Sequence, residues 1–158
     1  MPDSADRPPL DPAPDSADPI HWDVLGEVNR GSAGTLSDRM GIVYTEVGPQ
    51  RVVATMPVAG NTQPYGLLHG GASVVLAESI GSVLAVVSAG RGRTAVGVDI
   101  NATHHRPVTS GLVTGVATPL HVGRTTASFD VVISDEAGRR VCSCRFTAQL
   151  RDDPLTPR

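Results

Sequence analysis

The longest apolar segment of the chain, residues 72–89, carries hydrophobic or small side chains on every side of a helical projection. A helix that is hydrophobic all round is typical of a protein core. The pattern therefore predicts a buried helix that opens with His69-Gly70-Gly71 and stops at Gly90-Arg91-Gly92. Its length approaches that of a membrane span. However, Glu78 at its centre, Gly81 within it and strands on both sides favour a core helix.

Shorter runs rich in β-branched residues lie on both sides of this helix. Two strands, Met40–Glu46 and Arg51–Met56, are expected before it, around a hairpin signal at Gly48-Pro49-Gln50. Alternation of Val96, Val98 and Ile100 with polar or small residues predicts that these three share one half-buried face. Four strands are expected after the helix: Arg93–Thr103, Gly111–His121, Thr125–Ser134 and Arg139–Leu150.

The remaining segments complete the layout. Residues 20–28 predict a short amphipathic helix, residues 31–35 and 61–68 predict loops, and residues 135–138 predict a turn. Two strands, one long helix and four strands predict an α+β fold in which an antiparallel sheet wraps the helix. Residues 1–19 are rich in proline and acidic residues and predict a disordered tail. One domain is expected over residues 20–150, followed by a C-terminal tail at 151–158.

Composition excludes several classes of function. The net charge of −3 argues against nonspecific binding to nucleic acid or anionic membranes, and only five aromatic residues are available for base stacking. No basic segment precedes an apolar run at the start, so no signal peptide and a cytoplasmic location are expected. Cys142 and Cys144 point the same way along one predicted strand. They predict unreactive, half-buried thiols in a reducing compartment, with too few ligands for zinc.

Glu78 is the only charged residue between Ala72 and Ala89. An unpaired carboxylate removed from water costs several kcal/mol or shifts its pKa until it becomes neutral. Glu78 is therefore expected either to pair with a group distant in the sequence or to be held ready for chemistry. The residues around it bear on that choice.

Three ordered blocks give the chain a family resemblance. The pattern G-x-x-HGG-x(6)-E runs from Gly66 to Glu78, within QPYGLLHGGASVVLAESIGS; INATHHRP begins at Ile100 and PLHVGR at Pro119. Together they resemble hotdog-fold acyl-CoA thioesterases of the phenylacetate and hydroxybenzoyl-CoA types. The resemblance is strongest to the dihydroxynaphthoyl-CoA thioesterases of menaquinone synthesis and the proofreading thioesterases of enterobactin synthesis. It covers about Met40 to Leu150 and leaves out the proline-rich tail and the run from Ser88 to Arg93.

The resemblance implies a catalytic set. Glu78 would be the nucleophile or the general base that activates water, and both routes stay open. The amides of Gly70 and Gly71 at the helix start could hold the thioester oxygen, because helix N-termini carry unpaired N–H groups. Gln63 and His69 would contact the thioester carbonyl, although His69 could equally be a helix-start residue satisfied by backbone. A family site is shared across a homodimer, commonly within a homotetramer.

Ser82 lies four residues after Glu78, on the same helix face. It could orient water or hydrogen-bond the carboxylate, or it could be a small residue that permits close packing. Gly97 and two strand-end stretches correspond to coenzyme A contacts of the family, where cations would meet phosphates. These residues are His104, His105, Arg106, His121, Gly123, Arg124 and Thr125. No cofactor is implied, since coenzyme A belongs to the substrate, and no metal is expected.

Other functions within this fold remain open. A hydratase or dehydratase would need a His and an acid placed to move protons on the acyl chain, which fits the HGG-to-Glu spacing less well. A noncatalytic acyl-CoA-binding protein would have no need of Glu78. Hydrolysis of thioesters on an aryl carrier protein is a further alternative. No serine lies on a nucleophile elbow, so a serine-hydrolase triad is unsupported.

Overall fold

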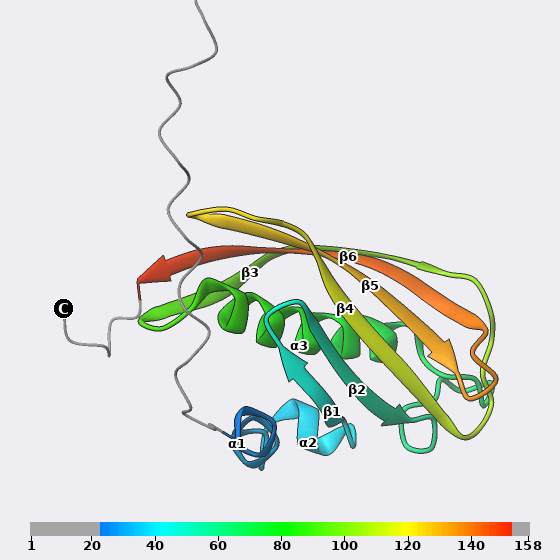
Figure 1. Ribbon diagram of the computed structural model, residues 1–158. Helices are drawn as coiled ribbons and strands as arrows, with labels where there is room; N and C mark the ends of the chain where they lie inside the picture. Colours follow the sequence, from blue (N-terminus) through cyan, green and yellow to red (C-terminus); the bar gives the residue numbers. More distant parts are fainter. Residues whose placement is uncertain (1–22, 153–158) are drawn as a thin grey trace, which may run out of the picture.

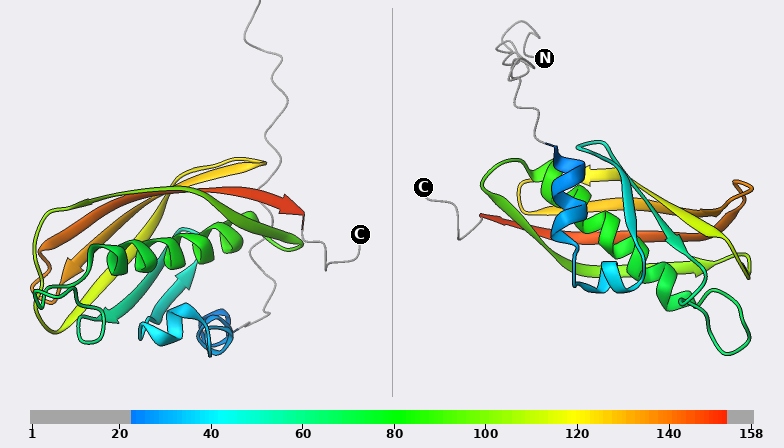
Figure 2. Two further views of the ribbon diagram at one scale, coloured as in Figure 1. Left: turned by 180° about the vertical axis from the view of Figure 1, so that it is seen from behind. Right: turned by 90° about the horizontal axis from the view of Figure 1, so that it is seen from below.

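A computed structural model of the chain describes residues 23–152. The predicted tail at 1–19 and residues 153–158 lie outside the described residues. One twisted antiparallel sheet curves around a single long helix, as Figure 1 shows, and Figure 2 shows the same helix lying along the concave face from two other sides. The elements in chain order are α1 (Val24–Gly31), α2 (Leu36–Arg39), β1 (Val43–Gly48), β2 (Arg51–Pro57), α3 (Gly70–Ala89), β3 (Arg93–His104), β4 (Leu112–Val122), β5 (Thr126–Asp135) and β6 (Arg140–Asp152).

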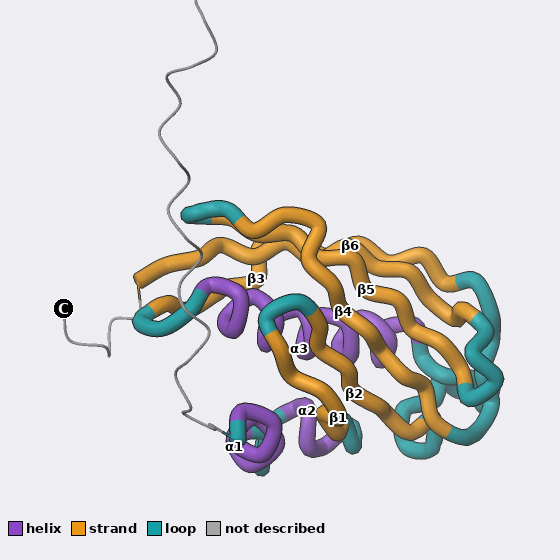
Figure 3. Tube along the Cα trace, in the orientation of Figure 1, coloured by secondary structure: helices purple, strands orange, loops and turns teal. Residues whose placement is uncertain are grey.

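The described sheet has six strands in the order β1-β2-β4-β5-β6-β3, and every neighbouring pair is antiparallel. The predicted hairpin is confirmed, since Gly48 pairs with Arg51 across Pro49-Gln50. Strand β3 follows α3 in the chain and lies at the far edge of the sheet, beside β6. The α+β architecture predicted from the sequence, a hotdog fold with an antiparallel sheet around one helix, is therefore confirmed, and Figure 3 separates its helical and strand layers.

The core lies between the sheet and one face of α3. Its members on the helix recur in adjacent pairs every four residues: Ala72, Ser73, Leu76, Ala77, Ile80, Gly81, Leu84 and Ala85. Gly81 permits close approach, because a Cβ added there would lie 2.6 Å from Phe146 Cδ1. Phe146 stacks against Phe129, with ring centroids 6.3 Å apart. Small residues on α3 thus let the sheet fold tightly over it.

The other face of α3 corrects the expectation of a helix buried all round. Glu78 is exposed in this chain, and Val86 is 41% exposed. The sheet covers only one side of α3, and α2 covers part of the rest at its middle. The apolar composition of α3 therefore exceeds what one chain buries.

The edge strand β3 corrects a second expectation. A bulge between Gly97 and Asp99 shifts the register, so Val96 pairs with Gln149 and Ile100 pairs with Phe146. One extra residue in a strand reverses the side on which later residues point. Val96 and Ile100 therefore lie on opposite faces, and Val96 and Val98 are 49% and 66% exposed. The prediction that Val96, Val98 and Ile100 share one half-buried face is therefore wrong, because the bulge interrupts the alternation.

The boundaries of α1 and β1 also differ from the predicted ones. Asp23 caps α1 by accepting a hydrogen bond from Gly26 N–H at 2.8 Å, so the helix begins at Val24 and runs three residues beyond the predicted end. Residues 20–22 lie outside the described part. The short helix α2 was not predicted, and it delays β1 to Val43 because Ile42 N–H still donates to Ser37 C=O.

The thiols of Cys142 and Cys144 do share one face of β6, as predicted. They are more buried than expected, at 0% and 3% exposed, with their Sγ atoms 3.5 Å apart. Hydrogen bonding between the thiols lowers the pKa of Cys142 and raises the pKa of Cys144, and burial raises the latter further. Buried thiols of this kind serve packing.

Candidate active site

The start of α3 offers one unpaired amide. His69 is the N-cap, and its Nδ1 accepts a hydrogen bond from Gly71 N–H at 2.8 Å. Gly71 is therefore not free to bind an oxygen, which corrects the expectation that both glycine amides are available. Gly70 N–H donates to no acceptor within residues 23–152. The positive end of the helix dipole thus presents a single open donor, at Gly70.

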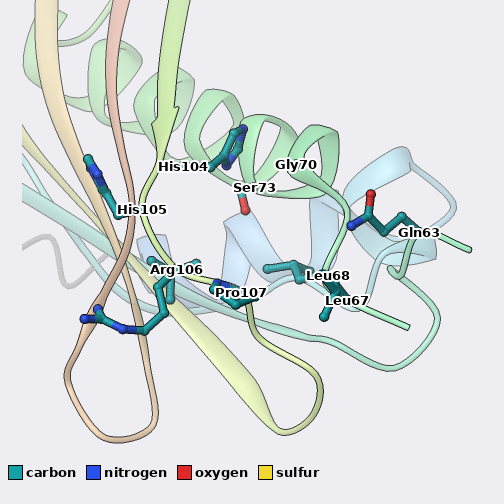
Figure 4. A pocket seen from close by; sticks show the side chains of 10 residues that line it. Gln63, Leu67, Leu68, Gly70, Ser73, His104, His105, Arg106 and Pro107 are labelled. Atoms are coloured by element: carbon teal, nitrogen blue, oxygen red, sulfur yellow. The ribbon is translucent and has the colours of Figure 1, made fainter. Parts of the chain in front are cut away.

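A hollow of about 400 Å³ lies beside this donor, and we call it the helix-start hollow. Figure 4 shows its polar members, Gln63 from the loop before α3, Ser73 from α3 and His104 from the end of β3. His104 packs against the helix start, since a Cβ added at Gly70 would lie 2.9 Å from His104 Nε2. The remaining lining residues are Leu67, Leu68, Gly70, His105, Arg106, Pro107 and Val141.

Ser73 was not predicted as a site residue. It is only 1% exposed and lines the helix-start hollow; its N–H donates to His69 C=O at 3.4 Å, and its hydroxyl bonds no other described residue. A serine one turn into an apolar helix resembles an ordinary small core residue in sequence, so no local signal marks it.

The rim of the helix-start hollow is cationic. Arg106 Nη1 donates to Arg140 C=O at 2.7 Å, and Arg140 Nη1 donates to Ser143 Oγ at 3.0 Å. His105 Nε2 lies 3.0 Å from the same Ser143 Oγ. The side chains of His105, Arg106 and Arg140 are exposed and are held in place by these bonds. Arg140 joins the predicted His105 and Arg106 because the β5–β6 turn ends beside them.

Glu78 lies in a second hollow, of about 430 Å³, which we call the Glu78 hollow. Its lining residues come from α2, β1 and the outer face of α3: Leu36, Ser37, Tyr44, Val75, Glu78, Ser79, Ser82 and Val83. Ser82 shares the hollow with Glu78, as the helical spacing predicts. Within residues 23–152 no ion pair or hydrogen bond reaches the Glu78 carboxylate. The acid is therefore exposed to solvent rather than buried, and it is not neutralised by an arginine of the described chain.

Glycine at position 97 leaves room for this carboxylate. A Cβ added to Gly97 would lie 3.3 Å from Glu78 Oε1 and 3.2 Å from Phe146 Cε2. The bulge that follows Gly97 belongs to the exposed edge of the sheet. Glu78 thus lies between α3, the edge strand β3 and solvent.

One chain does not bring the predicted catalytic residues together. Gly70 and Glu78 are eight residues apart on one helix, which corresponds to about 12 Å along its axis. Gln63 and Gly70 line the helix-start hollow, whereas Glu78 and Ser82 line the other. His69 lines neither of the two hollows and caps the helix instead.

The two predicted coenzyme A stretches also lie apart. Residues 104–106 follow the end of β3, beside the start of β6. Residues 121–125 comprise the end of β4 and the connection to β5, at the opposite end of the sheet, where Figure 1 shows a yellow hairpin. There Arg93, at the start of β3, donates from Nη2 to Arg124 C=O at 2.7 Å. Within one chain the length of β3 separates these stretches.

A cluster of hydroxyl groups was missed entirely by sequence reasoning. Ser37 Oγ and Ser79 Oγ lie 3.4 Å apart across 42 residues of sequence, and both line the Glu78 hollow with Tyr44. Burial raises the pKa of Tyr44, and the nearby Ser37 hydroxyl offsets part of that rise. No sequence pattern links these three positions, because α2 itself was not predicted.

Neither a metal site nor a membrane-spanning role is supported by the described residues. No group of three or more His, Cys, Asp or Glu side chains within the described residues is arranged to hold a metal ion. Among the described residues, one helix, α3, is long and apolar enough to cross a membrane by length and composition. Core helices of folded domains share that property, and the sheet packs along α3.

Comparisons with known proteins agree with this architecture. Residues 65–142 match the family described as the thioesterase superfamily. A Haemophilus influenzae thioesterase assigned to EC 3.1.2.- is 38% identical, with a TM-score of 0.80 over 85% of this chain and 94% of that one. A glutamine-to-alanine variant of a Pseudomonas aeruginosa thioesterase is also 38% identical, with a TM-score of 0.78 over 81% and 94% of the two chains.

A hypothetical thioesterase from Streptococcus pneumoniae, crystallised with coenzyme A, is 26% identical, with a TM-score of 0.64 over 71% of this chain and 87% of that one. Such relatives share the fold across almost their whole length. With 38% identity to a thioesterase over 85% of its residues, the chain belongs to the thioesterase superfamily and is a thioester hydrolase.

Proposed function

We propose that this chain hydrolyses acyl-CoA thioesters of hydroxylated aromatic acids in an active site shared between two chains. The helix-start block, from Gln63 to Ser82, resembles enzymes acting on such substrates, and dihydroxynaphthoyl-CoA is the first candidate. Coenzyme A accompanies a structural neighbour from Streptococcus pneumoniae. The cationic rim formed by His105, Arg106 and Arg140 supplies donors of the kind that phosphates require. An aryl carrier-protein thioester is the alternative substrate.

The observation that carries the proposal is the separation of donor and acid. Thioester hydrolysis needs a polarised carbonyl and a nucleophile within about 3–3.5 Å of its carbon. Gly70 N–H and the Glu78 carboxylate of one chain belong to two different hollows, about 12 Å apart along α3. A second chain that brings its own Glu78 to the first chain's Gly70 would complete the site.

The exposed edge of the sheet supports such pairing. β3 is twelve residues long and lies at the edge of the sheet, so one side of its backbone has no strand partner among residues 23–152. Exposed edge strands of this length tend to pair with another chain. Antiparallel pairing of two β3 strands would put the residues after His104 of one chain beside Arg93 of the other. Residues 104–106 and 121–125, which lie at opposite ends of one chain, would then meet. A homotetramer built from two such dimers stays a prediction.

In this site each group has one role. The thioester oxygen accepts a hydrogen bond from Gly70 N–H, which stabilises the negative charge that develops there. The carboxylate of Glu78 either attacks the carbonyl carbon directly or takes a proton from an attacking water. In both routes the C–S bond breaks and the thiolate of coenzyme A leaves and takes up a proton. In the direct route, water then cleaves the acyl–glutamate anhydride. Ser82 could hold the attacking water near Glu78.

The first test is steady-state hydrolysis by the wild type and by Glu78→Gln. The panel holds dihydroxynaphthoyl-CoA, 4-hydroxybenzoyl-CoA, a medium-chain acyl-CoA and an aryl carrier-protein thioester. We expect turnover to fall at least about a hundredfold, the usual scale for loss of an acid–base group. Glu27→Gln, on the exposed surface of α1, is the matched control and should keep full activity. Near-full activity of Glu78→Gln would show that the carboxylate is not catalytic.

The second test separates a shared site from a single-chain site. The variants Glu78→Gln and Gln63→Ala are each purified, unfolded, mixed and refolded together. If each active site takes Gln63 from one chain and Glu78 from the other, a dimer of one Glu78→Gln chain and one Gln63→Ala chain has one intact site. A random mixture would then recover about a quarter of the wild-type rate, since half the dimers would be mixed and each would have one of two sites intact. No recovery above the separate variants would place both residues in the same chain's site.

A further inference from the structure

The walls of the Glu78 hollow differ in chemistry. Leu36, Val75 and Val83 give it apolar side chains, and Leu36 is 57% exposed because the described chain covers it only in part. The same hollow carries the three hydroxyls of Ser37, Tyr44 and Ser79, which we call the hydroxyl cluster, and Ser79 lies between Val75 and Val83 on one face of α3. Glu78 lies in the same hollow, directly next to Ser79 in the chain. A group held here would therefore meet the catalytic acid, an apolar wall and the hydroxyl cluster together.

The hydroxyl cluster has unused hydrogen-bonding capacity. Each hydroxyl carries one proton and can accept two further bonds. Within the cluster, Ser37 bonds Ser79 at 3.4 Å and interacts with Tyr44, and these contacts use at most two of the three protons. No other described residue forms a hydrogen bond with any of these three hydroxyl groups. At least one donor and several acceptor positions therefore face the hollow.

This arrangement would be unfavourable for a purely hydrocarbon acyl group. Covering a polar group without giving it a partner forfeits its hydrogen bond to water. A site built around hydroxyls therefore disfavours ligands that lack a matching polar group. An aromatic ring would lie against Leu36, Val75 and Val83, and a hydroxyl on that ring would replace water at the cluster.

From this juxtaposition we infer that Ser37, Tyr44 and Ser79 are specificity determinants that recognise a hydroxyl substituent on the acyl group of the substrate. The inference rests on the proposed function and deepens it, since it gives the ring substituent a binding site separate from the thioester. These residues touch the part of the substrate that does not react. They discriminate between acyl groups and leave the chemical step to Gly70 and Glu78.

The test compares matched substrates that differ by one hydroxyl. kcat/KM is measured for benzoyl-CoA and for its 2-, 3- and 4-hydroxy derivatives with the wild type, Ser79→Ala and Tyr44→Phe. We expect the wild type to prefer one hydroxylated isomer, and each variant to lower that preference by about tenfold, equivalent to ~1.4 kcal/mol. The rate with benzoyl-CoA should not fall and should rise where its ring covers the cluster, because each variant removes a hydroxyl that this ring leaves without a partner. Ser134→Ala, on the outer face of β5, is the control and should change neither rate.

A second measurement covers variants with reduced turnover. Inhibition constants of benzoate and hydroxybenzoate, the product acids, report binding of the ring without catalysis. The same loss of preference should appear in these constants. An unchanged preference in both variants, or equal losses for all substrates, would overturn the specificity role and leave only a structural contact between α2 and α3. Absence of any thioester hydrolysis by the wild type would instead overturn the proposed function, and this inference with it.

Discussion

Replacing Gly81 by alanine tests how closely α3 packs against the sheet. Sequence alone predicts that this change stabilises the protein, because alanine exceeds glycine in helix propensity by about 1 kcal/mol. The structure predicts the reverse. The added Cβ would lie 2.6 Å from Phe146 Cδ1, 3.0 Å from Cγ and 3.3 Å from Cβ, distances too short for van der Waals contact.

The size of the effect follows from how little Phe146 can move. Its side chain is 1% exposed, its ring stacks on Phe129, and its far edge lies against Gly97. Inserting a methyl into a well-packed core costs about 1–3 kcal/mol. With the propensity gain of about 1 kcal/mol subtracted, and the cost at the upper end because the ring is held, Gly81→Ala should lower the free energy of unfolding by about 1–2 kcal/mol.

Urea denaturation at one fixed protein concentration measures this change, since association of chains would otherwise shift the midpoint. Gly31→Ala is the control: Gly31 also lies in a helix, as the last residue of α1, but a Cβ there meets nothing within 4 Å. That variant should be neutral or slightly stabilising. If Gly81→Ala is as stable as Gly31→Ala, the close approach of α3 to β6 described above is wrong.

Three further predictions concern the helix start, an acidic turn and the cationic rim. His69→Ala removes the acceptor of Gly71 N–H and should lower the free energy of unfolding by about 0.5–2 kcal/mol in urea titrations. Asp135 is the last residue of β5, just before the turn to β6; burial would raise its pKa, but hydrogen bonds from Arg139 and Ala137 and the Arg139 charge outweigh this and lower it. The wild type should therefore lose stability as pH falls below the ordinary carboxyl value, whereas Asp135→Asn should lose less, as thermal melts between pH 6 and pH 3 would show. Arg140→Gln should raise KM for acyl-CoA with little change in kcat and leave KM for the matching acyl-pantetheine, which lacks the nucleotide phosphates, unaltered.

The sequence predicted the central helix and the strands because their signals are local. An unbroken apolar run over residues 72–89 has few structural solutions, and Gly90, with a φ of 83°, ends it as glycine commonly does. The strands were bounded by turn residues such as Gly48-Pro49 and Gly138. Spacing along α3 also put Glu78 and Ser82 on one face, and the structure confirms that they share a hollow.

Features that depend on distant parts of the chain escaped prediction. The bulge in β3 arises from pairing with β6, about fifty residues later, and nothing in residues 96–100 marks it. The partners of Ser79 come from α2 and β1, and the closure of the helix-start hollow depends on the loop after His104. Composition could not reveal that the sheet covers only half of α3, because apolar residues surround the whole helix.

The partial exposure of α3 is relevant to function. A helix with apolar residues on all sides satisfies the sequence rule for burial, yet one chain buries only the face toward the sheet. The exposed face holds Val75, Val83 and Val86 around a carboxylate that the described chain leaves without a partner. Apolar side chains are favourable there only when another surface covers them. Pairing of two chains and occupation by an acyl group would each provide such cover. Under the proposed function, the complex of two chains with substrate would account for the composition of α3, and Glu78 would be withdrawn from water only when a thioester is bound.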